Sequence, residues 1–389
     1  MTRVLMFCSQ FHPIIGGAEE QARRLAERLR DQGVDVLVVT PRLVADSPPH
    51  ENVGGVPVVR FPLTDIVAAS PVKIRGLGVP NTLVQGLQIH RAIRRHLVDR
   101  DLLHIHLASA AASFATRVAQ LLGKPSICKI ACGGEGFDFI ELDHTSLLGP
   151  RLRRRMIGAM TRWIAISSEI EDDLVQAGVD RERIVRIPNG IDPTIYPVRD
   201  PRIAIEHFLY LGRLEKCDVE TLIEAFARHA AKYPRSRLRI AGKGDPGPAR
   251  RALQARPELG DRVELPGFVQ AADAYAWADA VVHPSRAEGL ANTLLEALCM
   301  GIPCVASDIA PNAEVLGGGK AGLLHAPADA EALAGCMDAL AGTPTEAAGV
   351  GRAGTRRILE VYDIGEVARS YASLYSELTA TSEIVRAVA

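Results

Sequence analysis

The segment SRAEGLANTLLEALCMGIPCVASD, residues 285–308, contains two glutamates, Glu288 and Glu296, that are separated by seven residues. If the whole span were helical, a rise of ~1.5 Å and a turn of ~100° per residue would place the carboxylates roughly 12 Å and about 80° apart. That separation is too large for an acid and a base that act on the same bond. It suits an elongated polar ligand that is held at two points, whereas two solvated glutamates are the alternative, because exposed acids are common.

The residues around the two glutamates favour different local structures. Gly289 favours a loop around Glu288. Residues 293–300 are expected to form a helix that carries Glu296. The segment should therefore present one carboxylate from a loop and the other from a helix.

The composition bounds the class of protein. The chain has 389 residues, of which 47% are hydrophobic and 23% charged, so it is expected to be globular with two or three domains. A net charge of −1 gives no reason to expect nucleic acid as a partner. The seven cysteines include no CxxC pair, which predicts reduced thiols and neither a zinc site nor a disulfide framework. The absence of a long apolar run or a signal-peptide pattern predicts a cytoplasmic protein.

A cluster of basic residues leaves a membrane contact open. It consists of Arg151, Arg153, Arg154 and Arg155. On a helix, these arginines could contact anionic lipid head groups, which would place the protein at the inner face of the membrane. A solvated basic helix face explains the same cluster.

Short Val- and Ile-rich runs alternate with amphipathic helical stretches along the chain. This alternation is expected of βαβ units and parallel sheets. We expect a first α/β domain at 1–192 and a second at 206–365, joined by a proline-containing linker at 193–205. The last helical stretch, within 366–389, is expected to pack back on the first domain.

A GxGxxG pattern at Gly242, Gly244 and Gly247 follows an expected strand directly. Such a pattern can mark a dinucleotide-binding turn, and an NAD-dependent oxidoreductase would rest on it alone. Its position in the middle of the chain and the neighbouring prolines, Pro246 and Pro248, favour a structural turn instead.

Two places in the sequence could bind phosphate groups. Gly16 and Gly17 join the first strand to the first helix, where backbone N–H groups and the helix dipole favour an anion. Arg213 and Lys216 follow a strand of the second domain, and open α/β sheets bind ligands at this edge. The planar guanidinium of arginine and the ammonium of lysine can both bind phosphoryl oxygens. A tight turn and two surface cations are the alternatives.

Two histidines, His104 and His106, alternate along the expected strand LLHIHLA. Alternation places both side chains on the same face of the sheet. His106 is nearer the end of the strand and is therefore the better functional candidate, although a buried histidine more often has a structural role.

Six stretches of the chain together resemble one family. They are GGAE (16–19), HIH (104–106), IAISSEIEDDL (164–174), IPNGID (187–192), LGR (211–213) with a following lysine, and the 285–308 segment. They are similar to the retaining, nucleotide-sugar-dependent glycosyltransferases of the large family 4, which have GT-B architecture. The resemblance covers nearly the whole chain, and the Glu-x7-Glu segment is its most specific part. It implies an α/β fold of two Rossmann-like domains that face each other across a cleft, with the donor held mainly by the second domain.

The resemblance also implies roles for individual residues. Glu288 would contact hydroxyls of the donor sugar, and Glu296 the ribose hydroxyls. Arg213 and Lys216 would bind the diphosphate, while His106 would lie near the reacting sugar and the acceptor. His106, Arg213, Lys216 and Glu288 are thus the expected catalytic residues. The other expected contacts are the diphosphate-binding amides at Gly16 and Gly17, the donor-binding backbone at Gly289, Leu290, Ala291 and Asn292, the turn beside the base at Gly267 and Phe268, and the acceptor-side loop at Gly133, Gly134 and Glu135.

One departure from the family pattern concerns the lysine. The family usually places it about five residues after the arginine, in a form like GRLxxxKG. Here GRLEKCDVE puts Lys216 three residues after Arg213 and lacks the glycine. A shortened loop would explain the difference.

The expected reaction is transfer of a hexose-type sugar from a nucleoside-diphosphate sugar, with UDP as the default nucleotide. The acceptor hydroxyl would belong to a glycan, a lipid-linked sugar or a small natural product, and the anomeric configuration would be retained. Neither a metal nor another cofactor is expected, because no Asp-x-Asp pair lies in a plausible position. The alternatives are a nucleotide-sugar epimerase or hydrolase on the same scaffold, and a non-catalytic nucleotide-sugar-binding subunit.

Overall fold

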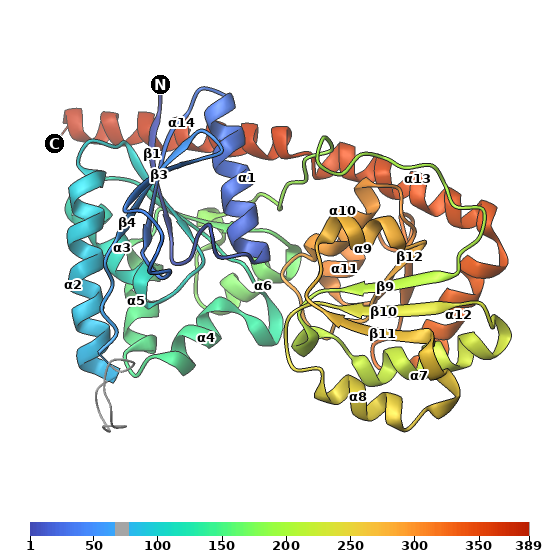
Figure 1. Ribbon diagram of the computed structural model, residues 1–389. Coiled ribbons are helices and arrows are strands. Elements are labelled where there is room, and N and C mark those ends of the chain that lie inside the picture. Colours follow the sequence, from blue (N-terminus) through green and yellow to red (C-terminus); the bar gives the residue numbers. More distant parts are fainter. Residues whose placement is uncertain (67–77, 389) are drawn as a thin grey trace. The chain divides into compact units, whose positions relative to one another are not determined.

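The computed structural model describes residues 1–66 and 78–388, and contacts within it divide the chain into two units (Figure 1). Unit 1 comprises Met1–Gly190 and Ile364–Ala389, and unit 2 comprises Ile191–Asp363. Residues 193–205, expected as a linker, therefore belong to unit 2.

A largely parallel sheet forms the centre of unit 1. Among the described residues its strand order is β3-β4-β2-β1-β5-β6-β7-β8, and β3 alone runs antiparallel to its neighbour. The strands are β1 (Arg3–Cys8), β2 (Asp35–Pro41), β3 (His50–Val53), β4 (Val56–Phe61), β5 (Leu102–His106), β6 (Ser126–Lys129), β7 (Arg162–Ala165) and β8 (Ile184–Arg186).

Helices cover the sheet of unit 1 (Figure 1). They are α1 (Gly17–Asp31), α2 (Gly78–Leu97), α3 (Ala110–Leu121), α4 (Asp138–Thr145), α5 (Gly149–Ala159), α6 (Ser168–Gln176) and α14 (Ile364–Val388). Helix α14, red in Figure 1, packs beside α1 although it follows unit 2 in the sequence. Its residues Tyr371 and Tyr375 are fully buried in one hydrophobic core with Val4 and Met6 of β1 and Leu25 of α1.

Unit 2 contains a second parallel sheet, whose described strands have the order β11-β10-β9-β12-β13-β14. The strands are β9 (His207–Leu211), β10 (Arg237–Ala241), β11 (Val263–Gly267), β12 (Ala280–His283), β13 (Cys304–Ser307) and β14 (Leu323–His325). The helices are α7 (Val219–Lys232), α8 (Gly247–Gln254), α9 (Ala271–Trp277), α10 (Asn292–Cys299), α11 (Ala310–Val315), α12 (Ala330–Gly342) and α13 (Pro344–Val361).

Each sheet has a point at which the strand order reverses. In unit 1 the chain continues from β1 to one side and later returns at β5 on the other; in unit 2 the same happens at β9 and β12. Parallel α/β sheets bind ligands beyond the carboxyl ends of strands at such points. The residues that follow β1, β5, β9 and β12 are therefore the first candidates for a functional site.

The GxGxxG segment brings three strand ends of unit 2 together. Gly242 follows β10 with a φ of +146°, and an added Cβ would lie 1.6 Å from the carbonyl oxygen of Gly212. The N–H of Gly242 donates to the carbonyl of Gly267 at 2.8 Å, and the N–H of Gly212 donates to that of Ala241 at 3.0 Å. Close approach between backbones therefore accounts for Gly242.

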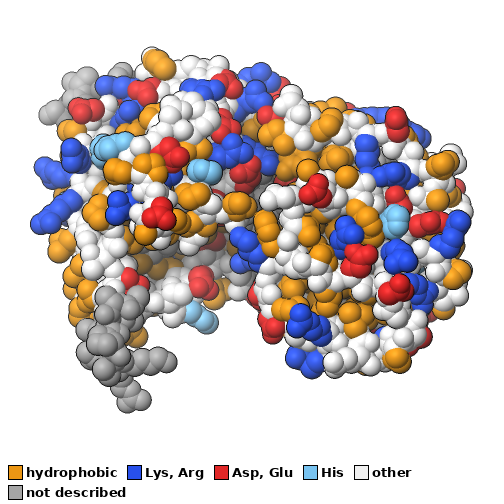
Figure 2. All heavy atoms as spheres, viewed as in Figure 1, with side chains coloured by type: hydrophobic (Ala, Val, Ile, Leu, Met, Phe, Trp, Pro, Cys, Tyr) orange, Lys and Arg blue, Asp and Glu red, His pale blue; other side chains and the backbone are white. Residues whose placement is uncertain are grey.

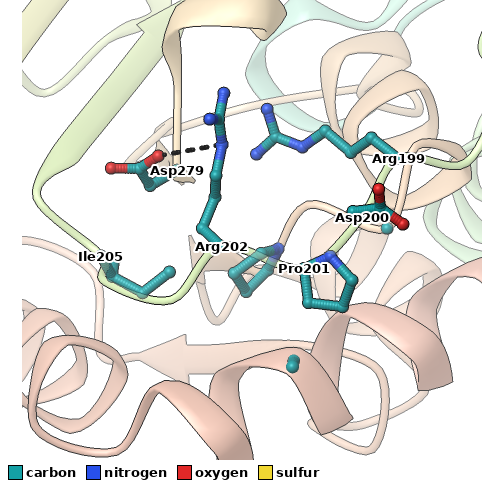
Figure 3. Close-up of a pocket in the computed structure, with 9 residues that line it drawn as sticks. Arg199, Asp200, Pro201, Arg202, Ile205 and Asp279 are labelled. Carbon is teal, nitrogen blue, oxygen red and sulfur yellow. Dashed lines mark ion pairs between the residues drawn. The ribbon is translucent and has the colours of Figure 1, made fainter.

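A small pocket of unit 2 lies at the opposite edge of this sheet (Figure 3). Asp279, directly before β12, accepts hydrogen bonds from the backbone N–H groups of Glu206 and His207 at 3.0 and 2.9 Å. Arg202 lies 3.4 Å from the same carboxylate. The pocket thus joins the amino ends of β9 and β12 and is remote from the edge where such sheets bind ligands.

The face of the molecule drawn in Figure 2 has no region where charged side chains of one sign predominate. Figure 2 shows acidic and basic side chains interspersed over the visible face. The arginine cluster lies on α5, where Arg153 pairs with Asp143 at 3.2 Å, while Arg151, Arg154 and Arg155 are exposed. No helix in the described part of the chain is both long and apolar enough to cross a membrane.

We predict that Gly242→Ala destabilises unit 2 by about 2–4 kcal/mol, because the new Cβ collides with a backbone carbonyl that cannot move alone. Gly318→Ala is the control: Gly318 has a φ of +64° but open space around it, so only about 1 kcal/mol is expected. Urea unfolding followed by circular dichroism measures both. Equal effects of the two substitutions would contradict the close approach.

Candidate functional site

Lys216 and Glu288 form an ion pair at the carboxyl edge of the sheet of unit 2. The Nζ of Lys216 lies 2.7 Å from Oε2 of Glu288, which is only 8% exposed. Lys216 ends a 3₁₀ turn, Leu214–Lys216, that follows β9, and Glu288 lies in the loop after β12. The short spacing between Arg213 and Lys216 therefore corresponds to one tight turn, which places Lys216 next to Glu288.

The sequence analysis missed His283, which also contacts Glu288. Its Nε2 lies 3.3 Å from Oε1 of Glu288 and 2.9 Å from Oγ of Ser285. The imidazole stacks on the ring of Tyr210, whose hydroxyl donates to the carbonyl of Arg213 at 2.8 Å. His283 ends β12, five residues before Glu288, and this position at a strand end was the one available signal.

The contacts of Glu288 determine its protonation state. Burial by itself raises the pKa of Glu288, but the hydrogen bond and charge of His283 and the charge of Lys216 lower it to about 2. An ionised carboxylate only accepts hydrogen bonds. Glu288 is therefore suited to bind hydroxyl groups and cannot act as a general acid near neutral pH.

Glu296 lies in α10 and is held by two tyrosines. The hydroxyl of Tyr196 donates to Oε1 and that of Tyr275 to Oε2, both at 2.8 Å. Thr293 of the same helix donates to the carbonyl of Leu211 at 2.8 Å and so fixes the start of α10 against the end of β9. The carboxylate of Glu296 thus has a defined position at the same edge of the sheet as Glu288.

The backbone between the two glutamates leads into the start of α10. This stretch comprises Gly289, Leu290, Ala291 and Asn292, of which Leu290 and Ala291 are buried. Ala291, the residue before α10, has no polar side chain that could cap the helix. The start of a helix carries partial positive charge and N–H donors, so this position suits an anionic group.

Further cationic and aromatic side chains follow β9, β10 and β11. Arg213 is exposed, and its guanidinium pairs with no carboxylate in the described part of the chain. Phe268 is 51% exposed after the turn at Gly267, which has a φ of +74°, and the Nζ of Lys243 lies 5.2 Å from its ring centroid. An exposed ring beside cations could border the base of a nucleotide.

In unit 1, Gly16 and Gly17 lie at the start of α1, as expected. Gly16 is extended, and an added Cβ there would lie 2.2 Å from Oε2 of Glu19. The Glu19 carboxylate thus folds back over the helix start. It would have to turn away before a diphosphate could approach these amides, because like charges repel.

The two histidines of β5 lie on one face, as predicted, and both are buried. Nδ1 of His104 lies 2.7 Å from the hydroxyl of Tyr375, and the rings of His104 and His106 stack at 4.4 Å. Burial lowers the pKa of His104 to about 3, and burial together with the charges of His104 and Lys129 lowers that of His106 well below its ordinary value. His106 is therefore a neutral imidazole at the end of β5.

The glycine-rich acceptor-side loop is organised by Asp138, another residue that the sequence analysis missed. Asp138 is buried and accepts hydrogen bonds from the backbone N–H groups of Ala108, Ala131 and Cys132 at 3.0–3.2 Å. The loop continues into a 3₁₀ turn, Gly134–Gly136, which contains the exposed Glu135 and follows the buried Gly133. Asp138 thus ties the loop after β5, next to His106, to the loop after β6.

The structure therefore groups the predicted residues within each unit. In unit 2 it joins Lys216 directly to Glu288 and places Glu296, Arg213 and Phe268 at the same sheet edge. In unit 1 the corresponding edge carries His106 and the loop at Gly133, Gly134 and Glu135. Across the residues described, no three His, Cys, Asp or Glu side chains are grouped so that they could hold a metal ion.

Comparisons with known proteins identify the class. Residues 15–195 match the family described as Glycosyltransferase Family 4, and residues 206–342 match Glycosyl transferases group 1. The crystal structure of Anabaena Alr3699/HepE in complex with UDP is similar at a TM-score of 0.76 and 19% identity, over 97% of this chain and 100% of that one. The fold is GT-B, with two Rossmann-like domains, as predicted.

The chain belongs to the family 4 glycosyltransferases, as the sequence motifs predicted. A glycogen synthase of Mycobacterium tuberculosis is 28% identical over 96% of this chain and 94% of its own. A phosphatidyl-myo-inositol mannosyltransferase of Mycolicibacterium smegmatis is 27% identical over 86% and 83%, respectively.

We predict that Lys216→Met lowers the free energy of unfolding at pH 7 by about 1–3 kcal/mol, because it leaves a buried carboxylate without its cation. Lys320→Met removes the same charge from an exposed position of unit 2 and should change stability by less than about 0.5 kcal/mol. Urea unfolding of both variants measures the difference.

The effect of Lys216→Met should depend on pH. The folded-state pKa of Glu288, about 2, lies below its ordinary 4.5, so its charged form stabilises the fold above pH 4.5. This contribution is lost as the pH falls through the folded-state value. The difference between the Lys216→Met variant and the wild type should therefore shrink from pH 5 to pH 3, and a constant difference would contradict the assigned ion pair.

Proposed function

We propose that the protein is a retaining glycosyltransferase that transfers a hexose-type sugar from a nucleoside-diphosphate sugar, with UDP as the first nucleotide to test, to an acceptor hydroxyl. The observation that carries the proposal is the buried, ionised Glu288, which Lys216 and His283 hold four residues before the start of α10. Glu288 can accept hydrogen bonds from sugar hydroxyls, and the start of α10, a few residues later, can bind an anion. A sugar attached to a diphosphate requires both kinds of contact.

The donor sugar is assigned to Glu288. Its carboxylate oxygens are held at 2.7 Å by Lys216 and at 3.3 Å by His283, and each oxygen has more than one lone pair. Glu288 can therefore accept hydrogen bonds from sugar hydroxyls without losing either protein contact. A preorganised acceptor of this kind has no reorganisation cost when the sugar binds.

The ribose is assigned to Glu296 by the same reasoning. Tyr196 and Tyr275 each occupy one position on its carboxylate and fix its orientation. We propose that the carboxylate oxygens of Glu296 accept hydrogen bonds from the two ribose hydroxyls. Phe268, exposed at the end of β11, would border the base.

The diphosphate is assigned to Arg213, Lys216 and the start of α10. Arg213 is exposed and has no carboxylate partner in the described part of the chain, so its fork is available for phosphoryl oxygens. The ammonium of Lys216 has three N–H donors and can contact Glu288 and a phosphate oxygen together. We propose that these groups, rather than a bound metal ion, offset the charge of the leaving group.

The reaction proposed is a front-face substitution at the anomeric carbon. The bond to the diphosphate breaks as the acceptor oxygen forms the new bond from the same side, which retains configuration. The departing phosphate oxygen takes the acceptor's proton. The protein's main contribution is electrostatic, because Arg213, Lys216 and the amides of α10 stabilise the negative charge that develops on the leaving group.

The acceptor is proposed to be a glycan, a lipid-linked sugar or a small natural product. The relatives include a glycogen synthase and a phosphatidyl-myo-inositol mannosyltransferase, whose names cover a polysaccharide and a lipid acceptor. Exposed Arg151, Arg154 and Arg155 on α5 are compatible with a peripheral contact to anionic lipid.

We predict that UDP or another nucleoside diphosphate raises the melting temperature of the full chain. Ligand at about 100 times its Kd should stabilise the fold by about 2.7 kcal/mol. A thermal-shift panel of UDP, GDP, ADP and their hexose derivatives, with and without EDTA, measures the preference. Binding that disappears in EDTA would overturn the proposed metal independence, and no response to any nucleotide would overturn the donor assignment.

We predict that Glu288→Gln reduces sugar transfer about 10²–10³-fold while UDP binding is retained, because the amide cannot reproduce the ionised acceptor. Glu360→Gln removes an exposed carboxylate of α13 and should leave transfer unchanged. Transfer and donor hydrolysis are measured together with the preferred donor. Undiminished turnover in Glu288→Gln would sink the assignment, and epimerisation of the donor without an acceptor would favour an epimerase.

A further inference from the structure

Lys129 is a buried lysine at the carboxyl edge of the sheet of unit 1. It is the last residue of β6 and is 6% exposed. In the strand register Cys8 of β1 pairs with His106 of β5, and His106 pairs with Lys129. These three residues form a row across the ends of three adjacent strands, about 4.8 Å apart from strand to strand.

The ammonium of Lys129 has no acidic partner in the described part of the chain. No ion pair or side-chain hydrogen bond links it to a carboxylate there. Asp138 uses its oxygens for three backbone N–H groups, and the charge of Glu19 acts on the thiol of Cys8. A lysine that is 6% exposed and has no carboxylate beside it is unusual, so its presence at this edge calls for an explanation.

Burial lowers the pKa of Lys129 to about 8, and the only opposing influence is the neighbouring Cys8. The side chain is therefore still mostly protonated at neutral pH. Cys8 cannot act as a counter-ion, because burial raises the pKa of its thiol and keeps it neutral. Among the residues of unit 1 that the structure describes, no anionic side chain pairs with this positive charge.

His106, beside Lys129 in the row, also has an unused polar group. Its Nε2 is buried and has no hydrogen-bond partner among the described residues. The imidazole is neutral, so Nε2 can donate or accept a hydrogen bond depending on its tautomer. The row therefore places an ammonium without a described carboxylate partner beside an imidazole nitrogen without a hydrogen-bond partner.

Beyond Leu107 and Ile130, which directly follow β5 and β6, the chain consists of small residues. Ala108 and Ser109 follow β5 after Leu107, and the stretch Ala131–Cys132–Gly133–Gly134 follows β6. Leu107 has a φ of +77°, which is rare for a residue with a side chain, and its N–H donates to the carbonyl of Lys129 at 2.9 Å. The loop after β5 is thus held in a strained form against the end of β6 by a hydrogen bond to Lys129 itself.

We propose that Lys129 and His106 form an anion subsite, and that the sugar acceptor carries a phosphomonoester or carboxylate group close to the hydroxyl that is glycosylated. This inference rests on the proposed transferase function, in which the sugar acceptor is the substrate assigned to unit 1. The anion supplies the counter-charge that Lys129 lacks, and Nε2 of His106 donates a hydrogen bond to the same group or to the neighbouring hydroxyl.

The test uses the full chain and four probes: inorganic phosphate, glucose 6-phosphate, glucuronate and glucose. Each probe is titrated by calorimetry in the presence of saturating UDP, which occupies the donor's own phosphate site. We expect one or both of the anionic sugars to bind at least about tenfold more tightly than glucose. Comparison of glucose 6-phosphate with glucuronate distinguishes a phosphate from a carboxylate subsite.

The variant Lys129→Met should lose this preference while its melting temperature without ligand stays equal or rises, because an unpartnered buried charge is removed. The matched control is Lys124→Met, which removes a lysine at the other end of β6 that donates to the carbonyl of Arg100 at 2.6 Å. It should keep the anion preference. Lys129→Gln provides a second, polar replacement.

Two results would overturn the anion subsite. The first is unchanged anion binding in Lys129→Met or no preference of the wild type for anionic sugars. The second is a strong fall in melting temperature in both Lys129 variants, which would reveal a structural partner for the lysine. The thermal-shift panel measures nucleotide binding separately. If anion binding depended on Lys129 but no nucleotide bound, the donor assignment would be refuted and the anion subsite would stand.

Discussion

Glu288 stays ionised although it is almost completely buried, and the local structure of unit 2 provides the groups that this requires. A buried carboxylate needs a cation and hydrogen-bond donors within reach. Lys216 reaches it from the turn after β9, and His283 from the end of β12. The two loops that carry these residues are joined by a backbone hydrogen bond from Asp218 to Pro284 and by a second between Arg286 and Lys216.

The support extends to the neighbouring strand and helix. Ser307, at the end of β13, donates to the carbonyl of Ser285 at 2.6 Å, and Asn312 of α11 donates to Ser307. Three consecutive loops at the carboxyl edge are therefore connected by buried hydrogen bonds. Such a network holds a polar side chain in one position, which favours binding without rearrangement.

Much of the fold could be predicted because βαβ patterns are local. The expected strand around Val4 and the helix around Glu296 lie where the periodicity placed them. The partners of the two glutamates could not be predicted in the same way. Tyr196 is 100 residues from Glu296, and Lys216 is 72 residues from Glu288. Pairings over such distances depend on the order of strands in the sheet, which hydrophobic periodicity does not specify.

Asp138 and His283, which the sequence analysis did not identify, share one property. Each forms hydrogen bonds to another part of the protein and belongs to no recognisable ligand-binding motif. Asp138 accepts three backbone N–H groups, a role that any turn residue with a carboxylate could have. His283 is one histidine at the end of a strand, without a second ligand-like residue near it in the sequence. Their importance appears only when the sheet brings separate loops together.

The two sheet edges differ in how their polar groups are satisfied. In unit 2, Glu288 and Glu296 each have at least two partners on their carboxylates, so both acids are held in place without a ligand. In unit 1, Nε2 of His106 is buried without a hydrogen-bond partner among the described residues, and no described carboxylate pairs with the neighbouring Lys129. A preformed edge binds a ligand with little rearrangement, whereas an edge with unpaired buried groups gains stability when a ligand supplies the missing partner. The contrast favours a rigid site for the donor in unit 2 and, in unit 1, a site whose stability increases when it is occupied.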